Sequence, residues 1–330
     1  MIHGIDMHTH FVPRDFPAYS GTEVACPWPS MAHTGSAANV MINGANYRTV
    51  PDTSWDGAKR IAEMDATGIR RHVVSPMPEL LSYWMTPRDG AALIGHVNEE
   101  IAALCDADPD RFSGIGGVPL QDLDLAIRAL EDIRATGRLV GVELATHVNG
   151  VSIGDPRFEP FFAAAERLDL PIFVHGLRPA GADRIIGRGL EQVVAFPGDV
   201  ALAIASMITG STLAKHPNLR MSFSHGGGAI AVLIARMEQG WNTGGPMRDL
   251  IPEPPSAYAR RLYYDTLVYS APVLRLVIDT FGIDRVMIGT DYPFGIMDTD
   301  PHGSVDALGL DEASAALIRD GNARRFFGID

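Results

Sequence analysis

Short apolar runs alternate with longer amphipathic segments along most of this 330-residue chain. The apolar runs predict strands at residues 2–10, 72–77, 112–119, 139–145, 171–175, 220–225, 261–269 and 285–291. Segments with helical periodicity lie between and after them, at residues 55–67, 93–106, 123–136, 159–167, 199–209, 229–239, 271–280 and 311–325. Repeated strand–helix units indicate a parallel sheet, and eight of them favour a closed barrel over an open doubly wound sheet. We therefore predict the α/β class, as one (β/α)8 TIM barrel domain over residues 1–330.

Residues 11–53 interrupt this alternation. They are rich in proline and glycine and are too long for an ordinary connection between a strand and a helix. Because they follow the first strand, they would cover the mouth of a barrel. We predict a small insertion or lid here, with a β-hairpin as one form of it. A second proline-rich segment, residues 244–256, predicts a loop or an arm between subunits.

Polar side chains close several of the predicted strands. His8 and His10 end the first strand, and they point to the same side because side chains alternate along a strand. His175 ends PIFVH, His225 ends MSFSH and Asp291 ends RVMIGTD. The carboxyl ends of all barrel strands meet at one face, where barrel enzymes carry their active sites. We therefore expect these side chains to form one site.

Three imidazoles and one carboxylate are a donor set typical of a metal site. These donors suit Zn²⁺, with Mn²⁺, Co²⁺ and Fe²⁺ as alternatives by ligand type. The expected ligands of one divalent ion are His8, His10, His175 and Asp291. His225 remains for general acid or base chemistry, because its ordinary pKa lies near neutral pH. Its alternatives are a fifth ligand or a hydrogen-bonding wall residue.

Composition restricts the partners and the compartment. The net charge of −13 argues against nucleic acid, because phosphate binding needs clustered positive charge. The first residues do not show the basic region, apolar region and cleavage site that make up a signal peptide. No uncharged apolar run reaches membrane-spanning length. The two cysteines form no CxxC pair and no disulfide framework. We expect a cytoplasmic protein that is not membrane-spanning, whose anionic substrate would need local arginines.

Several motifs resemble one known family over nearly the whole chain. They are GIDMHTHFVP, NYRTV, WDGAKRIAEMDATGI, VPLQDLDLA, PIFVHG, SHGGGA, MIGTDYPFG and GNARRFFGI. Together they resemble the amidohydrolase superfamily, in the branch of nonoxidative decarboxylases that includes aminocarboxymuconate semialdehyde decarboxylase. The resemblance implies a metal-dependent barrel with the ligands given above, and His225 as the acid or base residue. It also implies a homodimer or higher homo-oligomer.

The same resemblance assigns two arginines to the substrate carboxylate. Arg48 in NYRTV and Arg236 after SHGGG would bind it, and Arg236 would reach into the neighbouring subunit. An arginine suits this task because its guanidinium can hold a carboxylate at two points. Without the resemblance, each would be interpreted as a solvated surface residue.

The chain also departs from the family pattern. HGLRPAGADR follows the fifth strand where the decarboxylase has a proline–tryptophan pair, and it offers Arg178 as a substrate ligand. Gly244 stands near the place of a further arginine. The fourth strand, LVGVELATHVNG, lacks the lysine that bridges two metals in many hydrolases of the superfamily, so one ion is favoured. Glu143 in this strand is a ligand or a core residue, and His147 is a weaker candidate for contact with substrate.

Two chemistries fit this predicted site. The first is nonoxidative decarboxylation of a small unsaturated or aromatic carboxylic acid, with a metal-bound water or substrate oxygen and with His225 as acid or base. The second is hydrolysis of an amide, lactone, imine or carbon–carbon bond, in which Asp291 or His225 moves the proton. A barrel that has lost catalysis and only binds a partner is a third hypothesis, but every expected ligand type is present.

Overall fold

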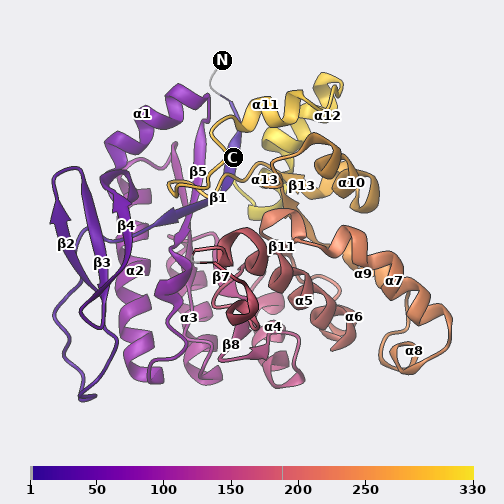
Figure 1. The fold of residues 1–330 in the computed structure, drawn as a ribbon, viewed down its shortest axis with the longest axis horizontal. Helices are drawn as coiled ribbons and strands as arrows, with labels where there is room; N and C mark the ends of the chain where they lie inside the picture. Colours follow the sequence, from indigo (N-terminus) through magenta and orange to yellow (C-terminus); the bar gives the residue numbers. More distant parts are fainter. Residues whose placement is uncertain (1–2, 188) are drawn as a thin grey trace.

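A computed structural model describes residues 3–187 and 189–330 of the chain (Figure 1). Its main sheet has eight parallel strands, which follow one another in the order of the sequence. The strands are β1 (Ile5–Phe11), β5 (Arg71–Pro76), β6 (Phe112–Gly117), β7 (Gly141–Ala145), β10 (Ile172–His175), β11 (Met221–Phe223), β12 (Tyr263–Asp265) and β13 (Val286–Met287). Backbone hydrogen bonds from Met7 to Ile288 (2.9 Å) and from Asp291 to His8 (2.9 Å) join the two ends of the sheet. The predicted (β/α)8 barrel is therefore confirmed.

Helices connect the strands and cover the outside of the barrel. The main ones are α1 (Gly57–Thr67), α2 (Pro87–Ala107), α3 (Leu123–Thr136), α4 (Glu159–Arg167), α5 (Phe196–Thr209), α7 (Ile230–Asn242) and α10 (Ala271–Phe281). Local signals fix their ends: the side chain of Asp122 accepts the backbone N–H of Leu125 at the start of α3, and Gly137 ends that helix with φ 65°. Shorter helices are α6 (Thr212–Lys215), α11 (Pro301–Asp306), α12 (Glu312–Ala316) and α13 (Asn322–Phe327).

Two predicted segments differ in the structure. The proline-rich segment 244–256 contains α8 (Pro246–Leu250) and the first residues of α9 (Pro255–Ala259) instead of only a loop, because proline is accepted in the first turn of a helix. The single helix expected at residues 311–325 is α12 and α13 with a π-helical turn, Leu317–Gly321, between them.

The insertion forms a three-stranded antiparallel sheet, which is one strand more than a hairpin. Its strands are β2 (Ser30–Thr34), β3 (Ala37–Ile42) and β4 (Ala45–Pro51), and they lie at one edge of the molecule (Figure 1). Asn43 and Gly44 both have positive φ at the tight turn between β3 and β4, as a two-residue hairpin turn requires. Val40 and Val50 bury the inner face of this sheet against the core. A further two-stranded ribbon, β8 (His147–Val148) and β9 (Val151–Ser152), follows β7.

Apolar side chains fill one end of the barrel and polar side chains its other end. Ile5, Met7, Ile115, Phe173 and Met287 form a buried cluster inside the strands. His8, His10 and His175 come later in the same strands, at their carboxyl ends, and are also buried. The two last strands are shorter than predicted because the chain turns into this polar layer. For example, the backbone N–H of Leu267 donates to the side chain of Asp265 (3.1 Å).

Candidate metal centre

Four buried side chains converge at the carboxyl end of the barrel. One ligand atom from each of them lies within 4.8 Å of the others. The four residues are His8, His10, His175 and Asp291. His10 Nε2 lies 3.2 Å from His8 Nε2 and 2.9 Å from Asp291 Oδ1. The structure thus brings together all four residues that the sequence predicts as ligands.

The outer nitrogen of each histidine is held by an oxygen acceptor. His8 Nδ1 lies 2.7 Å from Asp265 Oδ2, His10 Nδ1 lies 3.0 Å from the carbonyl oxygen of Pro76, and His175 Nδ1 lies 2.7 Å from that of Gly176. These contacts assign the N–H to Nδ1 and leave the lone pair on Nε2, which is how histidines bind metal ions. His175 Nε2 is buried and has no hydrogen-bond partner within the described part of the chain. The donor set therefore fits a divalent ion.

The electrostatics of the cluster also call for a cation. Burial lowers the pKa of His8, but its hydrogen bonds with Asp265 and Asp291 outweigh burial and raise that pKa to about 10. Burial raises the pKa of Asp291, but hydrogen bonds with His10 and His8 hold it well below its usual range. The carboxylates of Asp265 and Asp291 thus stay ionised, and they favour the protonated, positively charged form of the His8 imidazole. A bound metal ion would supply that charge in place of the proton.

Asp265 contacts the cluster directly and is not predicted from the sequence. Besides His8, it accepts the backbone N–H groups of His225 (3.0 Å), Gly226 (2.7 Å) and Leu267 (3.1 Å). It therefore orients one candidate ligand and the His225 backbone at the same time. Its signal was present, since it closes the apolar run LYYD, but the predicted strand continued to residue 269 and placed Asp265 in its middle.

His225 lies beside the cluster without being part of it. Its ring centroid is 4.9 Å from that of His175 and 5.6 Å from that of His8. The residue has φ 57°, a conformation that non-glycine residues seldom adopt and that often marks functional sites. Burial, followed by the charge of His8, lowers the pKa of His225 to about 4. The imidazole is therefore neutral in this environment and faces a cavity.

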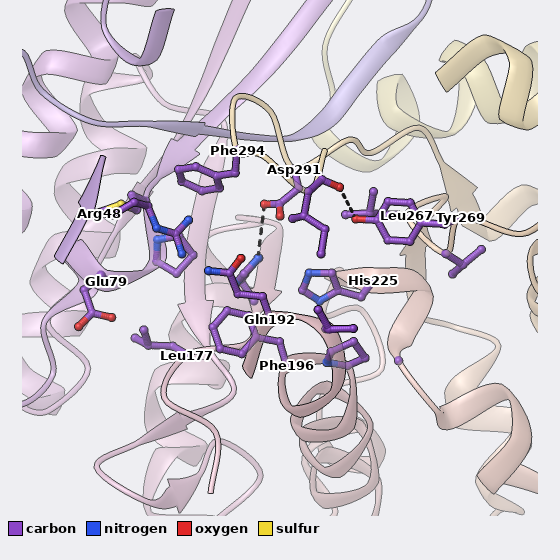
Figure 2. Close-up of a pocket in the computed structure, with 18 of the residues that line it drawn as sticks. Arg48, Glu79, Leu177, Gln192, Phe196, His225, Leu267, Tyr269, Asp291 and Phe294 are labelled. Atoms are coloured by element: carbon purple, nitrogen blue, oxygen red, sulfur yellow. Dashed lines mark hydrogen bonds and ion pairs between the residues drawn. The ribbon is translucent and has the colours of Figure 1, made fainter. Parts of the chain in front are cut away.

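The cavity in front of the cluster has a volume of about 400 Å³ (Figure 2). Most of its wall is apolar; examples are Met77, Leu177, Phe196, Leu267 and Phe294. Its polar wall residues include His175, His225 and Asp291 from the barrel and Tyr47 and Arg48 from β4 of the insertion. A concave, mostly apolar space with a few polar groups is typical of a site for a small molecule.

Arg48 lies near the cluster of candidate ligands, because both Arg48 and His10 contact the ring of Phe294. Its guanidinium carbon is 4.3 Å from the centroid of Phe294, and the other neighbour of that ring is His10, stacked at 5.0 Å. Arg48 makes no ion pair with any carboxylate among the described residues. The structure thus places a positive charge without a carboxylate partner on the cavity wall, where the sequence predicts a substrate-binding arginine.

The other predicted arginines lie outside this cavity. Arg178 pairs with Glu79, its Nε 3.0 Å from Oε1, and its guanidinium lies 3.2 Å from the centre of the Trp84 ring. Glu79 is a buried cavity residue that the sequence reasoning did not single out, and its carboxylate accounts for where Arg178 points. Arg236 is exposed on α7. Neither arginine lines the cavity of its own chain as the structure describes it.

Glu143 and His147 do not join the cluster either. Glu143 is completely buried in β7, and burial raises the pKa of its carboxyl well above the usual range. His147 contacts the backbone on both sides: its Nδ1 accepts the N–H of Gly150 (3.0 Å), and its Nε2 lies 3.0 Å from the carbonyl oxygen of Arg178. These contacts give His147 a structural role.

A (β/α)8 barrel with a histidine–aspartate cluster at its strand ends belongs to the class of metal-dependent barrel enzymes. Within that class, the chain belongs to the amidohydrolase family, whose sequence profile matches residues 5–329. The resemblance noted in the motifs is therefore confirmed.

Individual relatives agree with this assignment. The chain is 31% identical to 2-amino-3-carboxymuconate-6-semialdehyde decarboxylase of Dictyostelium discoideum over 329 residues, which are 99% of this chain and 92% of the relative. It is similar to the crystal structure of 2,6-dihydroxybenzoate decarboxylase complexed with 2,6-dihydroxybenzoate, with a TM-score of 0.74 and 25% identity over 82% of this chain and 87% of the other. IDCase from Metarhizium anisopliae shares the fold, with a TM-score of 0.82 and 23% identity over 99% and 97% of the two chains.

Proposed function

We propose that the protein is a metal-dependent, nonoxidative decarboxylase of a small unsaturated or aromatic carboxylic acid. The observation that carries this proposal is the buried ligand cluster, which opens onto an apolar cavity with His225 and Arg48 on its walls. The relatives named above as decarboxylases match most of the chain, which favours loss of carbon dioxide over hydrolysis.

The proposed ligands of one divalent ion are His8, His10, His175 and Asp291. Their three nitrogens and one oxygen favour zinc, and manganese, cobalt and iron(II) are the alternatives by ligand type. When bound, the ion would supply Lewis-acid chemistry, which orients a substrate oxygen and stabilises negative charge on it. The remaining steps belong to side chains of the chain itself.

The reaction needs one proton and one place for the departing carboxylate. The bond between the carboxylate and its carbon breaks, carbon dioxide leaves, and the electron pair left on that carbon takes up a proton. His225 is placed to relay this proton, because its buried imidazole faces the cavity beside the ligand cluster. Its neutral ring takes up a proton from the substrate acid or from solvent and gives it to that carbon, which returns the ring to its neutral form. Arg48 is placed to hold an acid group of the substrate by charge-assisted hydrogen bonds.

The mass of the product tests this proposal. Metal-loaded protein would be incubated with a panel of aromatic and muconate-type acids, with metal-free protein and His225→Ala as controls. We expect at least one acid to lose carbon dioxide only with the metal-loaded parent protein. A product that keeps its carboxylate and has gained the elements of water would identify a hydrolase instead.

We also propose that the chain works as a homodimer in the cytoplasm. Val232 on α7 is 68% exposed, Leu202 on α5 is 61% exposed and Val193 beside α5 is 55% exposed, so apolar side chains are exposed on two neighbouring helices. The helical segment Glu191–Thr209 is even apolar and long enough to cross a membrane by length and composition, and we assign its exposed side chains to a subunit contact. Both cysteines are unpaired, which suits a reducing compartment.

The dimer would give exposed Arg236 a role in the partner's cavity. Mixing Arg236→Ala protein with His225→Ala protein tests this directly, because one site of each hybrid dimer then has both residues intact. We expect recovery of activity in the mixture. No recovery despite demonstrated exchange of subunits would show that Arg236 does not serve a partner.

A further inference from the structure

Gln192 stands on the wall of the main cavity and has no part in the proposed chemistry so far. It belongs to a π-helical turn, Glu191–Ala195, that leads into α5. Such turns are rare and often occur at functional sites, because the extra residue displaces side chains from their regular helical positions. Figure 2 shows the Gln192 side chain within the cavity, between Arg48 on one side and His225 on the other.

Most other polar side chains of the cavity already have partners. The hydroxyl of Tyr269 donates to the carbonyl oxygen of Ile296 (2.7 Å), and that of Tyr47 donates to Glu79 Oε2 (2.9 Å). The remaining oxygen of Glu79 accepts from Arg178. Apart from the candidate ligands and His225, only Arg48 and Gln192 bring polar side-chain groups without a hydrogen-bond partner to this wall, within the described residues.

These two side chains would bind different groups of a ligand. The guanidinium of Arg48 is positively charged and suits an acid group. The neutral amide of Gln192 offers two N–H donors and a carbonyl acceptor, which match a hydroxyl or an amino group. A ligand with only an apolar ring beside this amide would remove its water and leave it unpartnered, which weakens binding.

Resting on the proposed function, we propose that Gln192 is a specificity-determining residue that hydrogen-bonds a hydroxyl or amino substituent of the substrate. Arg48 would bind the acid group and Gln192 the substituent, from neighbouring positions on the cavity wall (Figure 2).

Equilibrium binding tests this role without turnover. Metal-loaded protein would be titrated with benzoate, the three monohydroxybenzoates, 2-aminobenzoate and 2,6-dihydroxybenzoate. We expect at least one substituted acid to bind the parent protein about tenfold more tightly than benzoate, the effect of one hydrogen bond of about 1.4 kcal/mol. In Gln192→Met, which keeps the length of the side chain but removes its amide, this preference should fall to about twofold or less.

Two further variants complete the test. Glu191→Gln changes the exposed neighbour in the same turn and should keep the tenfold preference. Gln192→Glu keeps an acceptor but adds a negative charge, so it should weaken binding of all these acids. An unchanged preference in Gln192→Met, or equal binding of benzoate and every substituted acid to the parent protein, would overturn the inference. Carbon dioxide release is scored separately: its absence with every acid would refute the decarboxylase proposal and leave the binding result to stand alone.

Discussion

Replacement of Asp265 by asparagine tests whether the aspartate, which is not itself a proposed ligand, builds the metal site. The buried carboxylate accepts four hydrogen bonds, two at each oxygen: His8 Nδ1 and the His225 N–H at Oδ2, and the N–H groups of Gly226 and Leu267 at Oδ1. An asparagine amide keeps only one of these oxygens. Whichever way it is turned, its NH2 group faces two N–H donors, and both are left without an acceptor.

The expected magnitudes follow from that conflict. Each buried donor without a partner costs about 1–3 kcal/mol, so Asp265→Asn should lower the free energy of unfolding by about 2–6 kcal/mol. Loss of a group that orients a metal-binding histidine typically weakens metal affinity by about 10–100-fold. Metal affinity would be measured by competition with a chelator, and stability by urea unfolding.

Asp132→Asn is the matched control for this experiment. Asp132 is exposed on α3, so the same change of charge should leave both quantities almost unaltered. If Asp265→Asn bound the metal as tightly as the parent protein while folded, the contact between Asp265 and His8 would have no role in placing the ligand.

Three further predictions concern the metal and the cavity. Elemental analysis of metal-loaded protein should give about one equivalent per chain, as expected for a single four-ligand site; two equivalents, with one lost in Glu143→Gln, would contradict the mononuclear site. His225→Ala should keep the metal but lose about 10²–10⁴-fold in turnover, and loss of metal would reassign His225 as a ligand. Arg48→Ala should lower kcat/KM for an acidic substrate by about 30-fold or more, equivalent to about 2 kcal/mol. Arg14→Ala, at an exposed arginine of the same insertion, should have no comparable effect, and equal losses would point to a general charge effect.

The sequence predicts the barrel and the ligand cluster because both leave local signals. An apolar run that ends in one polar residue, such as PIFVH before Gly176, indicates a strand. It also indicates that the polar side chain lies at the carboxyl end of that strand. Once the strands are taken as a barrel, His8, His10 and Asp291 must meet at one face. No knowledge of distant contacts is needed for this step.

The remaining features depend on tertiary partners that a local pattern does not contain. Arg178 turns to Glu79, which is 99 positions away in the sequence, so its distance from the main cavity could not be read from HGLRPAGADR. The end of β12 depends on Asp265, whose side chain accepts hydrogen bonds from the backbone N–H groups of His225 and Leu267. Likewise, the third strand of the insertion follows from pairing within a region whose apolar pattern is weak.

The product formed in deuterium oxide tests the central claim most directly. Metal-loaded protein would turn over its best acid in this solvent, and the product would be examined by mass spectrometry and NMR. We predict a product that has lost its carboxylate and carries one deuteron at the carbon that held it, because the electron pair left by carbon dioxide takes its proton from an exchangeable group such as His225. A product that retains the carboxylate and has added the elements of water would contradict the decarboxylase assignment.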